Sequence, residues 1–143
     1  LFATTLDVYL TMGDIPDDDD DVDTANGRSA TKQESLHRLA RAICADATEF
    51  DAADARTAAE YVAGIQHRQL AAAVSRVIDR QSGPCLQTWI SGSGAFLAER
   101  VIRSESRLAH AHANFLTQMF DPSVSEAACA FAVARLAAER LAT

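Results

Sequence analysis

The sequence predicts an α/β fold in which helices dominate. Residues 86–98 combine a short apolar strand, a glycine turn and an amphipathic helix, which is the basic unit of α/β domains. Residues 51–81 carry one long, alanine-rich helical pattern. The chain has 143 residues, of which 48% are hydrophobic, and this length is enough for one domain with a real core. We therefore expect close-packed helices around two or three strands.

The glycine turn is the first candidate site. Its sequence is Ser91-Gly92-Ser93-Gly94. Glycine lets the backbone approach a ligand closely and reach positive φ. The start of the following helix adds free N–H groups and the positive end of the helix dipole. The turn therefore predicts a pocket for a nucleotide or a phosphate, with an ordinary strand-to-helix turn as the alternative, because a lone Gly-x-Gly is a weak signal.

Residues 1–12 place their apolar side chains on one helical stripe, although their Val, Tyr and Thr also suit a strand. We favour a helix that ends at Gly13. Asp7 lies inside this apolar run, just after Thr4 and Thr5. A carboxylate there needs a partner, a metal ion or solvent. Asp7 is therefore either part of an exposed helix face or an acid that faces a cleft.

An acidic loop is predicted at residues 13–30. Its aspartate run at residues 17–21 repels itself and is typical of a solvated surface, and it lacks the spacing of a calcium loop. The Asn-Gly pair at residues 26–27 indicates a tight turn. The flanking Asp23 and Arg28 could pair with each other or reach a polar ligand.

Three further helices are expected. One begins with a capping box at Thr31 and ends near residues 45–48, with His37, Arg38 and Arg41 on its polar side. Another covers residues 51–81. The last covers residues 127–141, and we expect its apolar side chains to lie mostly inward. Ser123 or Ser125 is expected to cap the element that begins at these serines.

Two histidines lie in a stretch of ambiguous pattern. Residues 108–113 alternate apolar and polar side chains, which favours a strand with His110 and His112 on one face, and a helix is the alternative. His-x-His on a strand can bind a metal ion, but no neighbouring side chain completes a ligand set in the sequence.

Composition excludes some classes of partner. The net charge of −7 argues against nucleic acid and against an anionic membrane surface, since both select for basic patches. No apolar run approaches the ~20 residues that span a bilayer. The cysteines Cys44, Cys85 and Cys129 fit no zinc or disulfide framework and are expected to be small buried hydrophobic residues in a reducing cytoplasm.

Three blocks of the sequence resemble one known family. They are LFATTLDVYLTMGDIP (residues 1–16), DTANGRSATKQESLHRLARAICAD (residues 23–46) and WISGSGAFLAERVI (residues 89–102). The chain is similar to the C-terminal half of tetrahydromethanopterin-linked one-carbon transfer pathway proteins, relatives of the hydantoinase/oxoprolinase group. The resemblance covers most of residues 1–98 and returns at the C-terminal helix. It implies a helix-rich C-terminal lobe of an actin-like ATPase (ribonuclease H-like) fold, with residues 1–143 as one partial domain.

The resemblance also implies an activity. Archaeal members of the family are methanofuran-biosynthesis enzymes, which join an aminomethylfuran diphosphate to a glutamyl-tyramine phenol and release pyrophosphate. We therefore expect a cytoplasmic transferase with a small-molecule substrate, Mg²⁺, and ATP or a diphosphate as ligand. Ser91, Gly92, Ser93 and Gly94 would line the nucleotide or diphosphate cleft. Asp7 would be the base or lie on the metal side, with Thr4, Thr5, Asp23 and Arg28 on the substrate side.

Two departures from the family limit what is carried over. The Asp-x-Gly-Gly and threonine-rich phosphate loops of such proteins lie in an N-terminal half outside these residues, so we read the chain as part of a longer polypeptide. Ala95 follows the glycine turn where many relatives have an acid. An ATP-dependent hydantoinase/oxoprolinase-like hydrolase or kinase and a non-catalytic binding lobe are the alternatives. An apolar face on residues 1–12, left uncovered by a missing lobe, would favour a homodimer.

Overall fold

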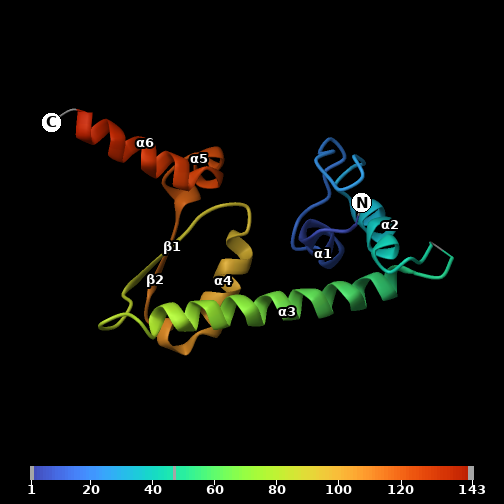
Figure 1. The fold of residues 1–143 in the computed structure, drawn as a ribbon, viewed down its shortest axis with the longest axis horizontal. Helices are drawn as coiled ribbons and strands as arrows, with labels where there is room; N and C mark the ends of the chain where they lie inside the picture. Colours follow the sequence, from blue (N-terminus) through green and yellow to red (C-terminus); the bar gives the residue numbers. More distant parts are fainter. Residues whose placement is uncertain (1, 47, 142–143) are drawn as a thin grey trace. The chain divides into compact units, whose positions relative to one another are not determined.

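The computed structural model describes residues 2–46 and 48–141 (Figure 1). The prediction of a helix-rich α/β chain is confirmed, because helices accompany a small sheet of two parallel strands. By its internal contacts the chain forms two compact units, unit 1 up to Arg68 and unit 2 from Gln69 onward. The long helix α3, Ala52–Ile78, contributes to both. The actin-like fold and the single partial domain stay predictions.

The other elements follow in chain order. Unit 1 contains α1 (Thr5–Met12) and α2 (Lys32–Ala42). Unit 2 contains β1 (Gln87–Ile90), α4 (Ala95–Ser104), the 3-10 turn η1 (Ser106–Leu108), β2 (His112–Phe115), the 3-10 turn η2 (Leu116–Gln118), α5 (Pro122–Glu126) and α6 (Ala128–Leu141).

Helix α1 ends where the sequence predicts. Gly13 adopts the left-handed conformation with φ +83°, and its N–H donates to the carbonyls of Tyr9 and Leu10. Val8, Tyr9 and Leu10 are buried, and α1 packs on α2. The expectation of an uncovered apolar face on this segment is therefore wrong for these residues, because the neighbouring elements of the same unit cover it.

Helix α2 begins at the predicted cap. The Thr31 hydroxyl accepts a hydrogen bond from the backbone N–H of Glu34 at 3.3 Å. Its apolar face joins α3 in a core made of Leu39, Ala40, Phe50 and Ala55. The polar side of α2 differs from the prediction, since Arg38 is fully buried.

Unit 2 is built on the parallel pair β1–β2. Gln87 lies opposite His112 and Ile90 opposite Phe115, and α4 lies in the connection between the strands. The predicted strand before the glycine turn is confirmed. The second strand begins only at His112, so His110 lies outside it and the two histidines do not share a strand face. The preceding chain is instead tied into η1, where the Leu108 N–H donates to the Glu105 carbonyl.

The structure corrects three expectations, two about the C-terminal helices and one about the cysteines. Asp121 caps α5, because its carboxylate accepts from the N–H and hydroxyl of Ser123, so neither Ser123 nor Ser125 is the cap. No described residue of α6 is buried, and the expected inward face of that helix is wrong. Cys44 and Cys129 are exposed and Cys85 is half-buried, so the prediction of buried cysteines is also wrong. Small alanine side chains define an inward face poorly, which explains the error in α6.

Glu105 makes the stability of unit 2 sensitive to acid. Its carboxylate accepts from Arg107 Nε at 2.9 Å and from the Ser75 hydroxyl at 2.8 Å. The hydrogen bond from Arg107, with that from Ser75, lowers the pKa of Glu105 from 4.5 to about 2. Because the folded pKa lies below the unfolded one, the stabilisation is present above about pH 4.5 and is lost as the pH falls towards 2.

We therefore expect Glu105→Gln to lower the unfolding midpoint of unit 2 near neutral pH and to have little effect near pH 2. The fluorescence of Trp89, the sole tryptophan of the chain, reports this unit. Glu126→Gln is the control, because Glu126 is exposed. An equal shift of the midpoint for Glu105→Gln at both pH values would contradict the account.

Candidate functional site

The glycine turn of unit 2 presents open backbone. Gly92 is left-handed with φ +88°, and Gly94 is the N-cap of α4 with φ −86°. A Cβ placed on either glycine would meet no heavy atom within 4 Å beyond its chain neighbours. Ser91 and Ser93 are exposed. The structure therefore keeps the four predicted residues together in one turn that a ligand can approach closely.

Helix α5 holds this turn in place. The hydroxyl of Ser125, which is 1% exposed, accepts a hydrogen bond from the backbone N–H of Gly92 at 3.2 Å. Sequence reasoning considered Ser125 only as a helix cap and missed this contact, because it joins residues 33 positions apart. The left-handed conformation of Gly92 is thus fixed by a buried partner.

The turn also lies at the edge of the sheet where ligands usually bind. Because β1 and β2 are parallel, their carboxyl ends, at Ile90 and Phe115, lie at the same edge. Open α/β sheets bind ligands outside the carboxyl ends of their strands. The first turn of α4 carries no acidic side chain, so the positive end of its dipole is not neutralised there.

An apolar cavity of about 290 Å³ reaches the turn at Gly94. Its other lining residues come from α3 and α4: Leu70, Val74, Leu97, Ala98, Val101 and Ile102. A cavity with this lining suits a flat ring more than a charged group. The turn and the cavity together offer neighbouring places for an anionic group and a ring.

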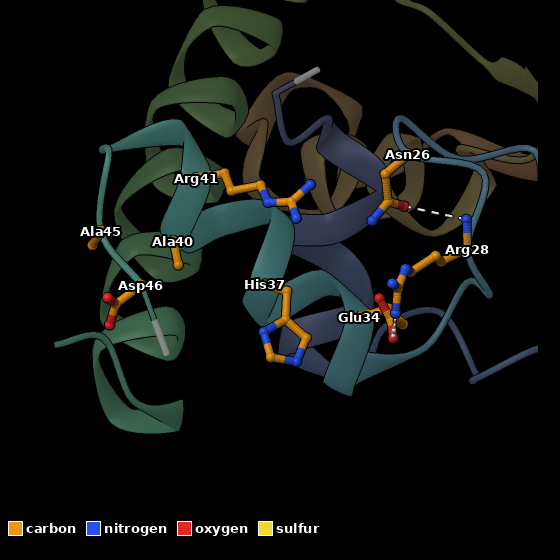
Figure 2. Close-up of a pocket in the computed structure, with 8 residues that line it drawn as sticks. All are labelled: Asn26, Arg28, Glu34, His37, Ala40, Arg41, Ala45 and Asp46. Atoms are coloured by element: carbon orange, nitrogen blue, oxygen red, sulfur yellow. Dashed lines mark hydrogen bonds and ion pairs between the residues drawn. The ribbon is translucent and has the colours of Figure 1, made fainter. Parts of the chain in front are cut away.

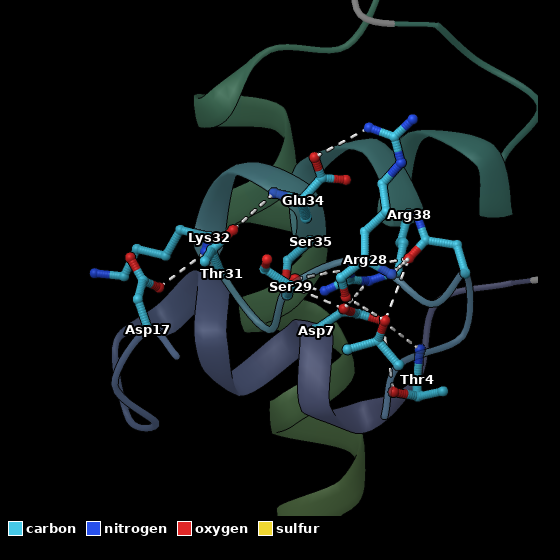
Figure 3. A network of polar contacts seen from close by, with 12 residues as sticks. Thr4, Asp7, Asp17, Arg28, Ser29, Thr31, Lys32, Glu34, Ser35 and Arg38 are labelled. Carbon is cyan, nitrogen blue, oxygen red and sulfur yellow. Dashed lines mark hydrogen bonds and ion pairs between the residues drawn. The ribbon is translucent and has the colours of Figure 1, made fainter. Parts of the chain in front are cut away.

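Asp7 lies in a buried ion pair of unit 1. Its Oδ1 atom is 2.5 Å from Arg38 Nε, and both side chains are at most 1% exposed (Figure 3). Ser35 Oγ donates to the same oxygen at 3.1 Å, and the N–H of Thr4 donates to Oδ2 at 2.8 Å. The interpretation of Asp7 as part of an exposed helix face is therefore wrong. Its partner is an arginine, and the carboxylate offers a substrate no open side.

Arg38 connects α1, α2 and the preceding loop. Its Nη1 atom donates to Asn26 Oδ1 at 3.1 Å and to the Ser29 carbonyl at 3.3 Å, and its Nη2 atom donates to Ser35 Oγ at 3.2 Å. This network satisfies a buried charge from three sides, as burial requires. It also fixes the side chain of Asn26.

The remaining predicted residues of unit 1 are dispersed. Thr4 and Thr5 are exposed at the start of α1, and only Thr4 contacts Asp7. Asp23 is exposed, and no ion pair joins it to Arg28 among the described residues. Arg28 instead pairs with Glu34 at 3.5 Å. The structure therefore does not gather Thr4, Thr5, Asp23 and Arg28 into one cleft.

Arg28 borders a second cavity, also of about 290 Å³, in unit 1 (Figure 2). The cavity is lined by Asn26, Arg28, Glu34, His37, Ala40, Arg41, Ala45 and Asp46. Sequence reasoning did not identify Arg41 or Asp46 as site residues, since it placed Arg41 on the polar side of the helix and Asp46 where that helix was expected to end. The positions of Glu34, His37 and Arg41, three and four residues apart, could have indicated a shared helix face.

Metal and membrane features are not found in the described ranges. Residues 2–46 and 48–141 contain no group of three or more His, Cys, Asp or Glu side chains that could hold a metal ion. Within the same ranges, no helix combines the length and the apolar character needed to cross a bilayer.

No protein-family model matches the chain, and no curated protein shows significant similarity to it. The family resemblance therefore stays a prediction from the three sequence blocks quoted above.

Proposed function

We propose that this chain is the nucleotide- or diphosphate-holding lobe of a cytoplasmic transferase in methanofuran-type cofactor biosynthesis. The reaction joins an aminomethylfuran diphosphate to a glutamyl-tyramine-like phenol and releases pyrophosphate. The observation that carries the proposal is the open Ser91–Gly94 turn at the carboxyl edge of a parallel strand pair. The sequence resemblance supplies the reaction, and the turn supplies a place for the diphosphate.

The chemistry needs stabilisation of a leaving group. The phenolic oxygen bonds to the methylene carbon of the furan while the bond from that carbon to the diphosphate oxygen breaks. Pyrophosphate leaves with the electron pair, and the phenol proton passes to a base. Backbone N–H groups and the positive end of α4 would stabilise the charge that develops on the leaving oxygen. Asp7 is unsuited to the role of base, because it is buried against Arg38.

Magnesium is the expected companion of a diphosphate. The described residues contain no group of three or more His, Cys, Asp or Glu side chains that could hold a metal ion by themselves, and the first turn of α4 has no acid. We therefore derive no step through a metal ion held by this chain.

The apolar cavity beside Gly94 is also compatible with a second function. A ring of suitable size in that cavity could be the furan of the proposed substrate or the adenine of ATP. An ATP-dependent hydrolase or kinase would use the same turn, would bind ADP in preference to pyrophosphate, and would consume ATP. A non-catalytic binding lobe would bind without turnover of either substrate.

Gly94→Ala tests the proposal with little expected change to the fold. At φ −86° with open space around it, alanine fits at this position, but its methyl group would occupy the place where a diphosphate approaches. We expect the affinity for pyrophosphate and for the furan diphosphate to fall at least ~10-fold, measured by titration calorimetry. Gly64→Ala, in the interior of α3, is the control and should leave both affinities unchanged.

The outcomes separate the candidates. Diphosphate binding that Gly94→Ala weakens supports the proposed site, and pyrophosphate release from the furan substrate supports the reaction. Hydrolysis of ATP without that release favours the hydrolase or kinase. Diphosphate binding that Gly94→Ala leaves unchanged overturns the placement at the turn, and no binding at all overturns the proposed function.

A further inference from the structure

We propose that the cavity of unit 1 binds a small zwitterion of the amino-acid class, with its carboxylate on Arg41 and Asn26 and its ammonium group on Asp46. The inference is independent of the glycine turn, since every lining residue belongs to unit 1.

Asn26 and Arg41 each turn a hydrogen-bond donor toward this cavity, and neither donor has an acceptor among residues 2–46 and 48–141. Asn26 is oriented by its oxygen, because Oδ1 accepts from Arg38 Nη1 at 3.1 Å and from the N–H of Arg28 at 3.3 Å. Its Nδ2 group is thereby turned the other way. Figure 2 shows this nitrogen and the guanidinium group of Arg41 pointing toward one another. A pair of facing donors is the arrangement that an oxyanion satisfies.

Arg41 is the cation available to a ligand. Its guanidinium group makes no hydrogen bond or ion pair with any residue that the structure describes. The other arginine of the lining, Arg28, is paired with Glu34 at 3.5 Å. One available guanidinium group matches one carboxylate, and a bidentate contact of this kind is favourable.

Asp46 supplies the opposite charge. The N–H and hydroxyl of Thr48 donate to its Oδ1 atom at 2.8 and 2.6 Å, and these bonds hold the pKa of Asp46 below its ordinary value. The carboxylate is therefore ionised at neutral pH. Both bonds from Thr48 go to Oδ1 of Asp46, and the side chain lies at the end of the cavity away from Arg28 (Figure 2).

The charges and the volume narrow the class of ligand. A phosphate would bring two negative charges near Asp46 and Glu34, and like charges at short range are unfavourable. A simple amine could pair with Asp46 but would make no contact with the facing donors of Asn26 and Arg41. A zwitterion satisfies both ends, and a cavity of about 290 Å³ limits it to a small molecule.

Calorimetric titration of the 143-residue chain with glycine, β-alanine, 4-aminobutyrate and glutamate tests the inference. We expect saturable binding of at least one of them and weaker binding of acetate, ethylamine and inorganic phosphate. Arg41→Gln and Asp46→Asn should each weaken the zwitterion at least ~10-fold. Asp46→Asn keeps an acceptor for Thr48, so the loop should stay folded, and circular dichroism checks this. Arg68→Gln, an exposed arginine of the same unit, is the matched control.

Two kinds of result would contradict the proposed zwitterion site. Absence of binding by all four zwitterions, or unchanged affinity in Arg41→Gln, overturns the inference. Acetate or phosphate binding as tightly as the zwitterions, and equally to Asp46→Asn, overturns the ammonium half of the site and with it the proposed class. None of these results bears on diphosphate binding in unit 2, so failure here is distinguishable from failure of the proposed function.

Discussion

Replacing Arg38 with leucine is expected to lower the free energy of unfolding of unit 1 by about 3–5 kcal/mol. The substitution leaves the carboxylate of Asp7 buried at 1% exposure without its charged partner, 2.5 Å away in the native chain. It also removes the donors that tie Asn26 and Ser29 to α2. Desolvated, unpaired charge is the largest single cost among these changes.

A double-mutant cycle isolates the ion pair. Asp7→Leu alone leaves Arg38 buried without its carboxylate, and the combined Asp7→Leu/Arg38→Leu variant removes both charges. We expect the double variant to lose less unfolding free energy than the two single variants lose together. The difference, measured by urea denaturation, should be about 0.5–3 kcal/mol. Arg56→Leu, which breaks only the exposed pair with Glu60, should cost at most about 1 kcal/mol. A loss for Arg38→Leu no greater than for Arg56→Leu would contradict the assignment.

Leu10→Ala is expected to cost about 2–5 kcal/mol, because Leu10 is 0% exposed and its truncation leaves a cavity within the packed α1 and α2. Leu136→Ala is the matched control, since that leucine is 61% exposed on α6 and its truncation should stay within about 0.5 kcal/mol.

Circular dichroism in urea measures both variants, and Trp89 fluorescence follows unit 2 separately. Equal losses for Leu10→Ala and Leu136→Ala would show that the burial of α1 is wrong.

Local signals predicted the elements well. The glycine turn, the cap at Thr31 and the stop at Gly13 depend on a few neighbouring residues, and the structure places each as expected. Helix α3 lies within the predicted 51–81 stretch for the same reason, since a long alanine-rich pattern has few other solutions.

Pairing across the chain could not be predicted. Asp7 and Arg38 are 31 positions apart, and each had an ordinary exposed interpretation when considered alone. The contact of Gly92 with Ser125 and the shared cavity of Asn26 and Arg41 are of the same kind. Charge and helical spacing identify candidate faces, but which faces meet depends on tertiary packing. The predictions of an uncovered apolar face on α1 and of an inward face on α6 were wrong for this reason.

The most direct test of the diphosphate site is an NMR titration of the ¹⁵N-labelled chain with pyrophosphate. We expect the backbone amide signals of Ser91 to Leu97 to shift first and saturably, because these groups form the turn and the first turn of α4. Signals of Thr4 and Thr5 should stay unchanged at the same concentrations. Shifts confined to other residues, or no saturable shift at the turn, would contradict the claim that this turn holds the diphosphate.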